Sequence, residues 1–203
     1  RIRVQLPQIS RVGVYANAKS LGAKSVEELH ALQQLGLGII YMGLESGDDR
    51  TLEQMRKGIG GEEMVAMGRK VKAAGIRLSV TVLLGIAGID GSAAHAVATG
   101  RVLTAMDPDY VGALSLMIEP GTPLHAAIQS GDFHVPDPMA LLQELRTIIA
   151  TTHLSNGLFH ANHASNYLPI RAKLPEEHAS TLALIDQALA GNTPLKPEYL
   201  RAL

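Results

Sequence analysis

Several residues that are able to bind a ligand follow directly after apolar runs with the composition of β-strands. The stretch Gly43-Leu-Glu-Ser-Gly47 follows one such run, Lys57 comes shortly after it, and Asn17 follows another. Glu45 and Ser46 carry oxygens that hydrogen-bond sugar hydroxyls, and the ammonium group of Lys57 suits a carboxylate or a phosphate. The glycines allow the backbone to approach a ligand closely. These residue types predict a site for a ligand that has both hydroxyls and an anionic group.

Each of these residues also has a simpler explanation. Gly and Ser often occur in strand-to-helix loops only to turn the chain and cap the helix. Lys57 is typical of a solvated residue at a helix end, where it complements the helix dipole. His160-Ala-Asn-His163 has a spacing that binds a metal when both histidines share a helix face. We expect no helix there and identify no third ligand, so we interpret both as surface or network histidines and predict no metal site.

The motif content excludes several enzyme classes. The chain contains no cysteine, which rules out disulfides, a cysteine nucleophile and thiolate-held metals within these residues. It also lacks a Gly-x-Gly-x-x-Gly sequence after a strand, a Walker lysine loop and a Gly-x-Ser-x-Gly elbow. The glycines of Gly58-Ile-Gly-Gly61 follow a helix, which favours a hinge over a dinucleotide site.

The composition predicts one folded domain without an electrostatic surface for large partners. The 203 residues have a net charge of −1, are 46 % apolar and are 18 % charged. This balance argues against nucleic acid or an anionic membrane as a partner. No apolar run is long enough to span a membrane and no signal peptide is recognisable, so we expect a cytoplasmic protein. Because the sequence starts with Arg1, we expect a longer parent chain.

The elements that must position these residues alternate along the first part of the chain. Strands that are apolar on both faces, separated by amphipathic helices, indicate a parallel sheet covered by helices. Ser25 and Glu28 have the spacing of a capping box, and Met64, Met67 and Val71 form a core stripe. We expect strands over residues 11–16, 39–42, 77–84 and 110–116, and helices over residues 25–35, 49–55, 62–74 and 92–106.

The alternation stops after residue 116. Helices are expected at residues 137–154, 175–190 and 196–203, around an irregular polar segment at residues 160–167. Two architectures fit the first part, an open doubly wound sheet and a partial β/α barrel. In both, ligands bind beyond the carboxyl ends of the strands.

Three segments in order carry a family resemblance. The stretch Tyr41–Gly58, with its Gly-Leu-Glu-Ser and Leu-Glu-Gln-Met-Arg-Lys-Gly sequences, resembles the fourth strand and next helix of radical S-adenosylmethionine enzymes. Thr81–Gly88 is similar to their fifth strand and its glycine-rich turn. Tyr110–Leu124, with Glu119-Pro-Gly-Thr-Pro, is similar to their sixth strand and its exit. Phe159–Ile170 also resembles a segment that follows the barrel in some members.

The resemblance implies a fold related to oxygen-independent coproporphyrinogen oxidase. It is an α/β fold, an incomplete parallel (β/α)6 TIM-like partial barrel represented here by strands three to six and followed by C-terminal helices. Residues 1–130 are then the C-terminal two-thirds of the barrel, and residues 131–203 are a mainly helical extension. The implied cofactor is S-adenosylmethionine.

Carried over by position, the resemblance also assigns cofactor-binding residues. Glu45 would contact the adenosine ribose, with Ser46 beside it, and Lys57 would pair with the methionine carboxylate. Thr81 would approach the ribose, and the backbone of Met117 would contact adenine. Asn17 and Tyr15 occupy the place where further polar contacts to the cofactor occur. Catalytic residues are not assigned.

The sequence departs from the family in its missing N-terminal features, a glycine-rich turn that follows the second strand and a cysteine loop that follows the first. Members hold a 4Fe-4S cluster on a Cys-x-x-x-Cys-x-x-Cys loop, receive an electron from a donor such as flavodoxin or ferredoxin, and generate a 5′-deoxyadenosyl radical. That loop is absent here. We therefore expect it to precede Arg1, and we expect these residues alone to be inactive.

One segment is expected to border the substrate. Residues 160–170 are predicted to close part of the cleft, with Asn162, His163 and Asn166 as polar contacts. The alternative is that these side chains satisfy backbone groups of an irregular loop.

Two other functions compete with the radical enzyme. One is a cluster-less module that binds S-adenosylmethionine or another nucleoside. The other is an aldolase-like barrel enzyme that uses Lys57 or Glu45, which we rank last because no lysine lies within the four expected strands.

Overall fold

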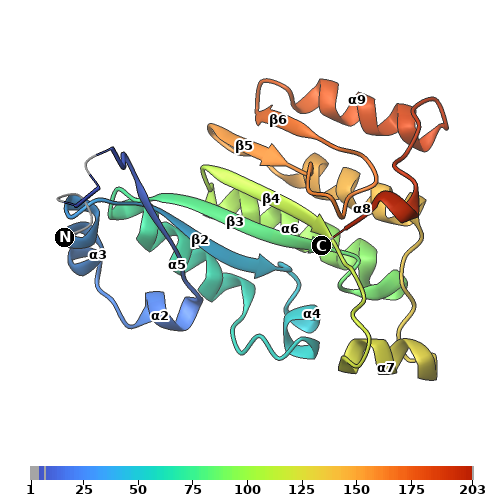
Figure 1. The fold of residues 1–203 in the computed structure, drawn as a ribbon, viewed down its shortest axis with the longest axis horizontal. Coiled ribbons are helices and arrows are strands. Elements are labelled where there is room, and N and C mark those ends of the chain that lie inside the picture. The colour runs from blue at the N-terminus through green and yellow to red at the C-terminus, as the bar shows by residue number, and fades with distance from the viewer. Residues whose placement is uncertain (1–4, 7, 203) are drawn as a thin grey trace.

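The computed structural model describes residues 5–6 and 8–202. Its centre is a single sheet of β1 (Val12–Tyr15), β2 (Leu37–Glu45), β3 (Arg77–Leu84), β4 (Tyr110–Ser115), β5 (Gly157–His160) and β6 (Arg171–Leu174). The strands lie in chain order across the sheet (Figure 1). Neighbouring strands from β1 to β5 are parallel, and β6 returns antiparallel to β5.

Helices pack beside this sheet, with the longer ones between parallel strands along one face and the last one after β6 (Figure 1). They are α2 (Ala18–Gly22), α3 (Val26–Gln34), α4 (Asp49–Gln54), α5 (Gly61–Ala73), α6 (Gly88–Met106), α7 (Pro123–Ser130), α8 (Pro138–Thr151) and α9 (His178–Leu189), with a short 3₁₀ turn η1 (Glu198–Leu200). Since the sheet does not close, the expected fold class, an incomplete parallel TIM-like partial barrel followed by helices, is confirmed.

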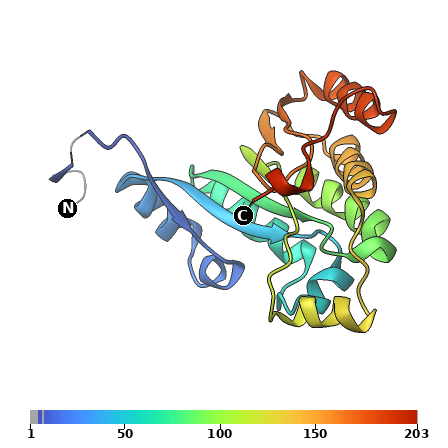
Figure 2. The same ribbon diagram turned by 45° about the vertical axis from the view of Figure 1, so that its right-hand side comes forward.

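The two faces of the sheet differ in solvent exposure. In β3, Leu78, Val80 and Val82 are buried against the helices, whereas Ser79 and Thr81 between them are half-buried. The apolar composition of the strands predicts that both faces of the sheet are buried. This prediction is wrong for the face that points away from the helices. The open face is therefore the inner surface of an incomplete barrel, and the turned view in Figure 2 shows how strongly the sheet twists around it.

Local sequence signals account for the helices that cover the other face. Ser25 and Glu28 form the expected capping box, in which the Glu28 amide donates to Ser25 Oγ at 3.2 Å and the Ser25 amide donates to Glu28 Oε2 at 2.7 Å. In α5, Met64 and Val71 are fully buried and Met67 packs beside them. The predicted core stripe of this helix is confirmed.

The sheet continues beyond the strands that the sequence indicates. His160, expected in an irregular segment, is the last residue of β5, which pairs with β4 so that Gly112 lies opposite it. Strand β6 then forms an antiparallel pair with β5. Both short strands were missed. One sheet therefore contains residues from both sides of position 130. The division of the chain into a barrel part at 1–130 and a helical extension at 131–203 stays a prediction.

The expected helix at residues 196–203 is wrong within its described part. Only Glu198–Leu200 forms a 3₁₀ turn, which ends at Arg201 because the backbone there is extended, with a ψ of 146°. Arg201 instead holds the tail down. Its guanidinium lies 4.2 Å from the ring centre of Tyr167, and it also donates to Leu116 O at 3.2 Å. The tail therefore runs beside the carboxyl end of β4 (Figures 1 and 2).

Candidate functional site

The carboxyl ends of β1, β2 and β3 surround a hollow of about 440 Å³ on the open face, which we call the carboxyl-end pocket. It contains five of the positions to which the resemblance assigns cofactor contacts. Ser46 and Met117 are not among its lining residues. The pocket is lined by Tyr15, Ala16, Asn17, Tyr41, Met42, Gly43, Glu45, Lys57 and Thr81.

Glu45 points into this pocket because the end of β2 is distorted. The pairing between β2 and β3 shifts register between Gly43 and Glu45, and Glu45 has a φ of 63°, which is unusual for a residue with a side chain. Its Oε1 accepts a hydrogen bond from Lys57 Nζ at 3.2 Å. The two side chains are 24 % and 25 % exposed, so this ion pair is accessible to a ligand.

Gly43 is required by the same arrangement. A Cβ atom at Gly43 would lie 2.2 Å from Glu45 Oε1 and 3.5 Å from Lys57 Nζ. The Glu45 carboxylate therefore occupies the space that a side chain at position 43 would fill. The conformational role of this glycine is specific to the pocket, since an alanine here would push Glu45 away from Lys57.

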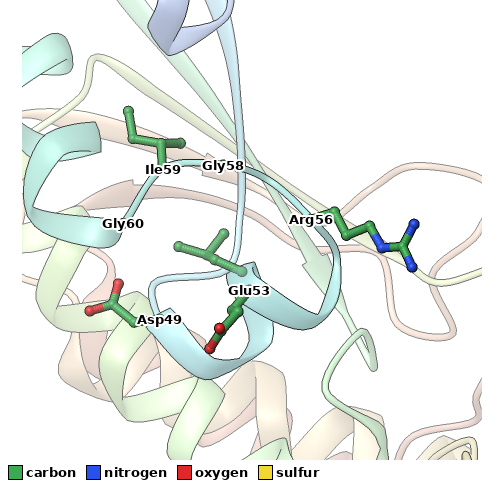
Figure 3. A pocket seen from close by; sticks show the side chains of 7 residues that line it. Asp49, Glu53, Arg56, Gly58, Ile59 and Gly60 are labelled. Atoms are coloured by element: carbon green, nitrogen blue, oxygen red, sulfur yellow. The ribbon is translucent and has the colours of Figure 1, made fainter.

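The turn that follows α4 places Lys57. The Lys57 amide donates to Leu52 O at 2.9 Å, which closes the end of the helix. Asp49 Oδ1 accepts from the Gly61 amide at 2.8 Å, so the next helix starts from a side chain of α4. Figure 3 shows the separate hollow of about 400 Å³ between α4 and this turn, with Arg56 pointing away from it. This hollow results from the turn and does not contain the predicted site residues.

The opposite wall of the carboxyl-end pocket comes from β1 and the start of α2. The rings of Tyr15 and Tyr41 lie 5.2 Å apart between centres and are tilted by 31°. Tyr15 is 90 % exposed, so it offers an aromatic surface to a flat ligand. Asn17 Oδ1 accepts from the Ser20 amide at 2.8 Å and caps α2, which is the simpler role considered for such residues.

Ser46, the residue directly after β2, points away from the pocket into a fully buried cluster. Its Oγ forms a hydrogen bond with His95 Nδ1 at 2.7 Å. His95 Nε2 faces Glu144 Oε1 at 3.5 Å without forming a hydrogen bond, and both side chains are 0 % exposed. Glu144 also accepts from the Gly85 amide at 2.7 Å and from the Ser92 hydroxyl. We call Ser46, His95 and Glu144 the buried triad.

The buried triad has the residue types of a hydrolase triad but not the access that such a site needs. Because none of its side chains reaches solvent, it acts as a structural link between the loops that follow β2 and β3. His95 and Glu144 were missed by sequence reasoning. The available signal was a carboxylate on the apolar face of a helix, since Glu144 lies among Leu141, Leu145 and Ile148, all of which are buried.

The residues proposed as substrate contacts mostly fix their own segment. Asn166 is buried, accepts from Ser115 Oγ at 2.8 Å and donates to Ala113 O at 2.8 Å. His163 Nδ1 accepts from the Ser165 amide at 3.2 Å, and Asn162 is exposed. Met117, in the loop after β4, is half-buried. A substrate or cofactor role for these four residues stays a prediction.

Two kinds of feature do not occur among the residues that the structure describes. No group of three His, Cys, Asp or Glu side chains comes together as a metal site within residues 5–6 and 8–202. In the same residues, none of the helices combines the length and the apolar character needed to cross a bilayer.

Comparisons with known proteins place the fold. No family model matches the sequence, and no curated protein matches it either. The structure is similar to that of Elp3 from the archaeon Methanocaldococcus infernus, with its N-terminus (1–46) deleted, at a TM-score of 0.59 and 12 % identity. It is also similar to methylornithine synthase (PylB), at a TM-score of 0.50 and 18 % identity. Both are radical S-adenosylmethionine enzymes.

These similarities extend over most of this chain but only part of the others. The aligned region covers 91 % of this chain and 43 % of the Elp3 chain, and 71 % of this chain and 40 % of the PylB chain. At such low identities, structural similarity establishes the fold. The resemblance seen in the sequence is therefore confirmed at the level of the fold: the chain has the partial barrel of radical S-adenosylmethionine enzymes and spans less than half of the length of these two.

Proposed function

We propose that this chain is the S-adenosylmethionine-binding part of a radical S-adenosylmethionine enzyme. The observation that carries this proposal is the carboxyl-end pocket. Tyr15, Asn17, Glu45, Lys57 and Thr81 come from different elements, yet all of them line one hollow of about 440 Å³. The site also lies at the carboxyl ends of parallel strands, where β/α folds bind their ligands.

The chemistry of the lining suits the parts of this cofactor. The ammonium group of Lys57 binds the methionine carboxylate, and the Glu45 carboxylate accepts hydrogen bonds from the ribose hydroxyls. The hydroxyl of Thr81 lies in the same hollow for a further ribose contact. Without a ligand, Glu45 and Lys57 satisfy each other at 3.2 Å. Binding then exchanges one accessible ion pair for two contacts with the ligand.

The cofactor, once reduced at its sulfonium, supplies hydrogen-atom abstraction from a substrate. The residues present do not fit the 4Fe-4S cluster that performs this reduction in the family, because the 203 residues include no cysteine. Within this proposal, the cluster ligands and the flavodoxin- or ferredoxin-type donor lie outside these residues. The contribution of the chain is to bind and orient the cofactor.

Calorimetric titration with S-adenosylmethionine tests the proposal. We expect saturable binding that Lys57→Ala weakens about tenfold, which corresponds to about 1.4 kcal/mol. The matched control is Lys24→Ala, because the Lys24 side chain is exposed and does not line the pocket. Equal affinities for both variants, or no binding by the unmodified chain, would contradict the proposal.

The missing cysteines favour a second candidate, a module that binds S-adenosylmethionine or a related nucleoside without redox chemistry. The full sequence of the natural protein, read by mass spectrometry, separates the two. A Cys-x-x-x-Cys-x-x-Cys loop elsewhere in the protein supports the radical enzyme. If the protein lacks that loop and its affinity for S-adenosylmethionine does not depend on iron, the binding module is favoured.

An aldolase-like activity is the least supported alternative. Lys57 follows α4, outside every strand, and its ammonium group is engaged by Glu45. We expect that borohydride traps no imine between Lys57 and a carbonyl compound.

A further inference from the structure

A second hollow lies on the open face, next to the carboxyl-end pocket. It has a volume of about 260 Å³, and we call it the mid-sheet pocket. It shares Tyr41 with the carboxyl-end pocket, so the two hollows are neighbours. Its lining consists of Arg11, Ile39, Tyr41, Ser79, Tyr110, Val111, Gly112 and His160.

The sheet register connects the two pockets through a glycine. Gly112 of β4 lies opposite Thr81 on one side and opposite His160 on the other. At a strand spacing of about 4.8 Å, Thr81 and His160 are about 10 Å apart across the sheet. A Cβ atom on Gly112 would meet nothing closer than Leu114 Cδ1 at 3.9 Å. The space above Gly112 is therefore open, which leaves room between the mid-sheet pocket and Thr81.

His160 presents an unsatisfied polar atom in this region. Its Nε2 is buried and has no hydrogen-bond partner among the described residues. Buried polar atoms are nearly always paired, so an unpaired one in a residue that lines a hollow indicates a missing partner. Burial lowers the pKa of His160, and the nearby charge of Arg171 lowers it further. The imidazole is thus neutral near pH 7 and has one N–H to donate.

The one charged residue that lines the mid-sheet pocket is an arginine, and two more arginines lie near it. Arg11 lines it, Arg77 donates to Tyr110 Oη at 3.4 Å, and Arg171 lies opposite His160 in the register of β5 and β6. Within the described part of the chain, none of the three arginines has a carboxylate within ion-pair distance. The lining itself contains no acidic residue. A concave site with cationic and neutral donors and no carboxylate favours an anion.

The nearest acidic residue along these strands is already engaged. Asp109, directly before β4, accepts a hydrogen bond from the Leu78 amide at 2.9 Å. Its carboxylate therefore links the start of β4 to the backbone of β3. The hydroxyls of Ser79 and Tyr110 and the guanidinium of Arg11 remain as groups that a ligand can contact.

We propose that the mid-sheet pocket binds the anionic group of a small organic substrate, either a carboxylate or a phosphate. Arg11 and the Tyr110 hydroxyl contact the anion, His160 donates a hydrogen bond from its imidazole, and the rest of the substrate lies over Gly112. That this ligand is the substrate of the S-adenosylmethionine reaction rests on the proposed function. The anion site itself does not.

The test is an NMR titration of the 203-residue chain with inorganic phosphate and, separately, with acetate at constant ionic strength. The imidazole resonances of His160 report on binding. We expect a saturable shift with at least one of the two anions, and the anion that binds more tightly identifies the source as a phosphate or a carboxylate. No shift of His160 with either anion would overturn the proposal.

Paired arginine variants distinguish a built site from a chance contact. Arg11→Gln is expected to weaken anion binding at least fivefold, whereas Arg101→Gln, an equal charge change at an exposed position of α6, leaves it unchanged. Equal weakening by both variants would show an adventitious ion only and overturn the proposal. A parallel titration with S-adenosylmethionine separates the two claims. Anion binding without cofactor binding contradicts the proposed function alone, and the reverse result contradicts the anion site alone.

Discussion

Two polar clusters start from neighbouring residues and have opposite properties. Glu45 points to the open face of the sheet and meets Lys57, with both side chains about a quarter exposed. Ser46 points to the helices and joins His95 and Glu144, which are completely buried. The residue types of the second cluster look more catalytic than those of the first. Their exposure to solvent indicates the opposite, because only the side chains of the first cluster are accessible to a ligand.

The same difference in exposure predicts which property each cluster controls. A buried polar group left without its partner loses its solvation and its hydrogen bonds together, so truncation there destabilises the fold. An exposed ion pair adds little to stability because water and salt screen it. We therefore expect the buried triad to control folding and the Glu45–Lys57 pair to control binding.

The largest effect is expected in the buried triad. His95→Ala removes the partner of Ser46 Oγ and leaves Glu144 facing an empty space, which should lower the free energy of unfolding by about 3 kcal/mol. Urea denaturation measures it. The control is His134→Ala at an exposed histidine, for which we expect a change within about 0.5 kcal/mol. A similar small change for both variants would mean that the triad is not a structural link.

The second effect concerns the backbone beneath the open cluster. In Gly43→Ala, the new methyl group takes the place of Glu45 Oε1, because the two would be 2.2 Å apart. The Glu45 side chain is free to move into the pocket, so the fold should survive. We expect about a tenfold loss of affinity for S-adenosylmethionine, a cost of about 1.4 kcal/mol. Gly112→Ala, on β4 with open space above it, serves as the control in calorimetry and should retain cofactor binding.

A pH effect of intermediate size is expected on the open face. Burial and Arg171 place the pKa of His160 below its ordinary value of 6.5. The unfolded chain therefore binds this proton more readily than the folded chain, so the contribution of His160 to stability is complete above pH 6.5 and is lost as the pH falls through its folded pKa. Urea midpoints between pH 5 and 8 should fall less steeply toward acid in His160→Gln than in the unmodified protein. Parallel curves would contradict this assignment.

The smallest effect is the change in stability on breaking the accessible pair. Lys57→Met removes the ion pair with Glu45 but retains most of the aliphatic stem. We expect the free energy of unfolding to change by less than about 1 kcal/mol. A loss comparable to that of His95→Ala would erase the distinction between the two clusters, and denaturation of both variants under identical conditions decides it.

Much of the fold follows from periodicity along the chain. The strands β3 and β4 and the helices α5 and α6 are long enough for their apolar pattern to predict them. Strands β5 and β6 each have only four residues, so the pairing of β5 with β4 and of β6 with β5, rather than their own sequence, makes them strands. The tail was wrongly predicted as a helix because the tertiary contacts of Arg201 with Tyr167 and Leu116, which hold it in place, are not visible in the sequence.

The site was partly predictable for a topological reason. Parallel strands bring their carboxyl ends to one edge, so Asn17 and Glu45 were expected to lie together before any geometry was known, whereas Thr81 was assigned only by the family resemblance. The opposite orientation of Ser46 depends on the bulge and the turn at the end of β2, which the sequence does not reveal. The pocket that His160 shares with Arg11 was not predicted, because it exists only once β5 takes its place beside β4.

The most direct test of the central claim is to map S-adenosylmethionine onto the chain by NMR amide shifts. The account predicts that the largest changes cluster at the carboxyl ends of β1 to β3, at Gly43, Glu45, Lys57 and Thr81, with much smaller changes at His95 and Glu144. Changes centred on the hollow beside α4 in Figure 3, or no changes at all, would contradict it.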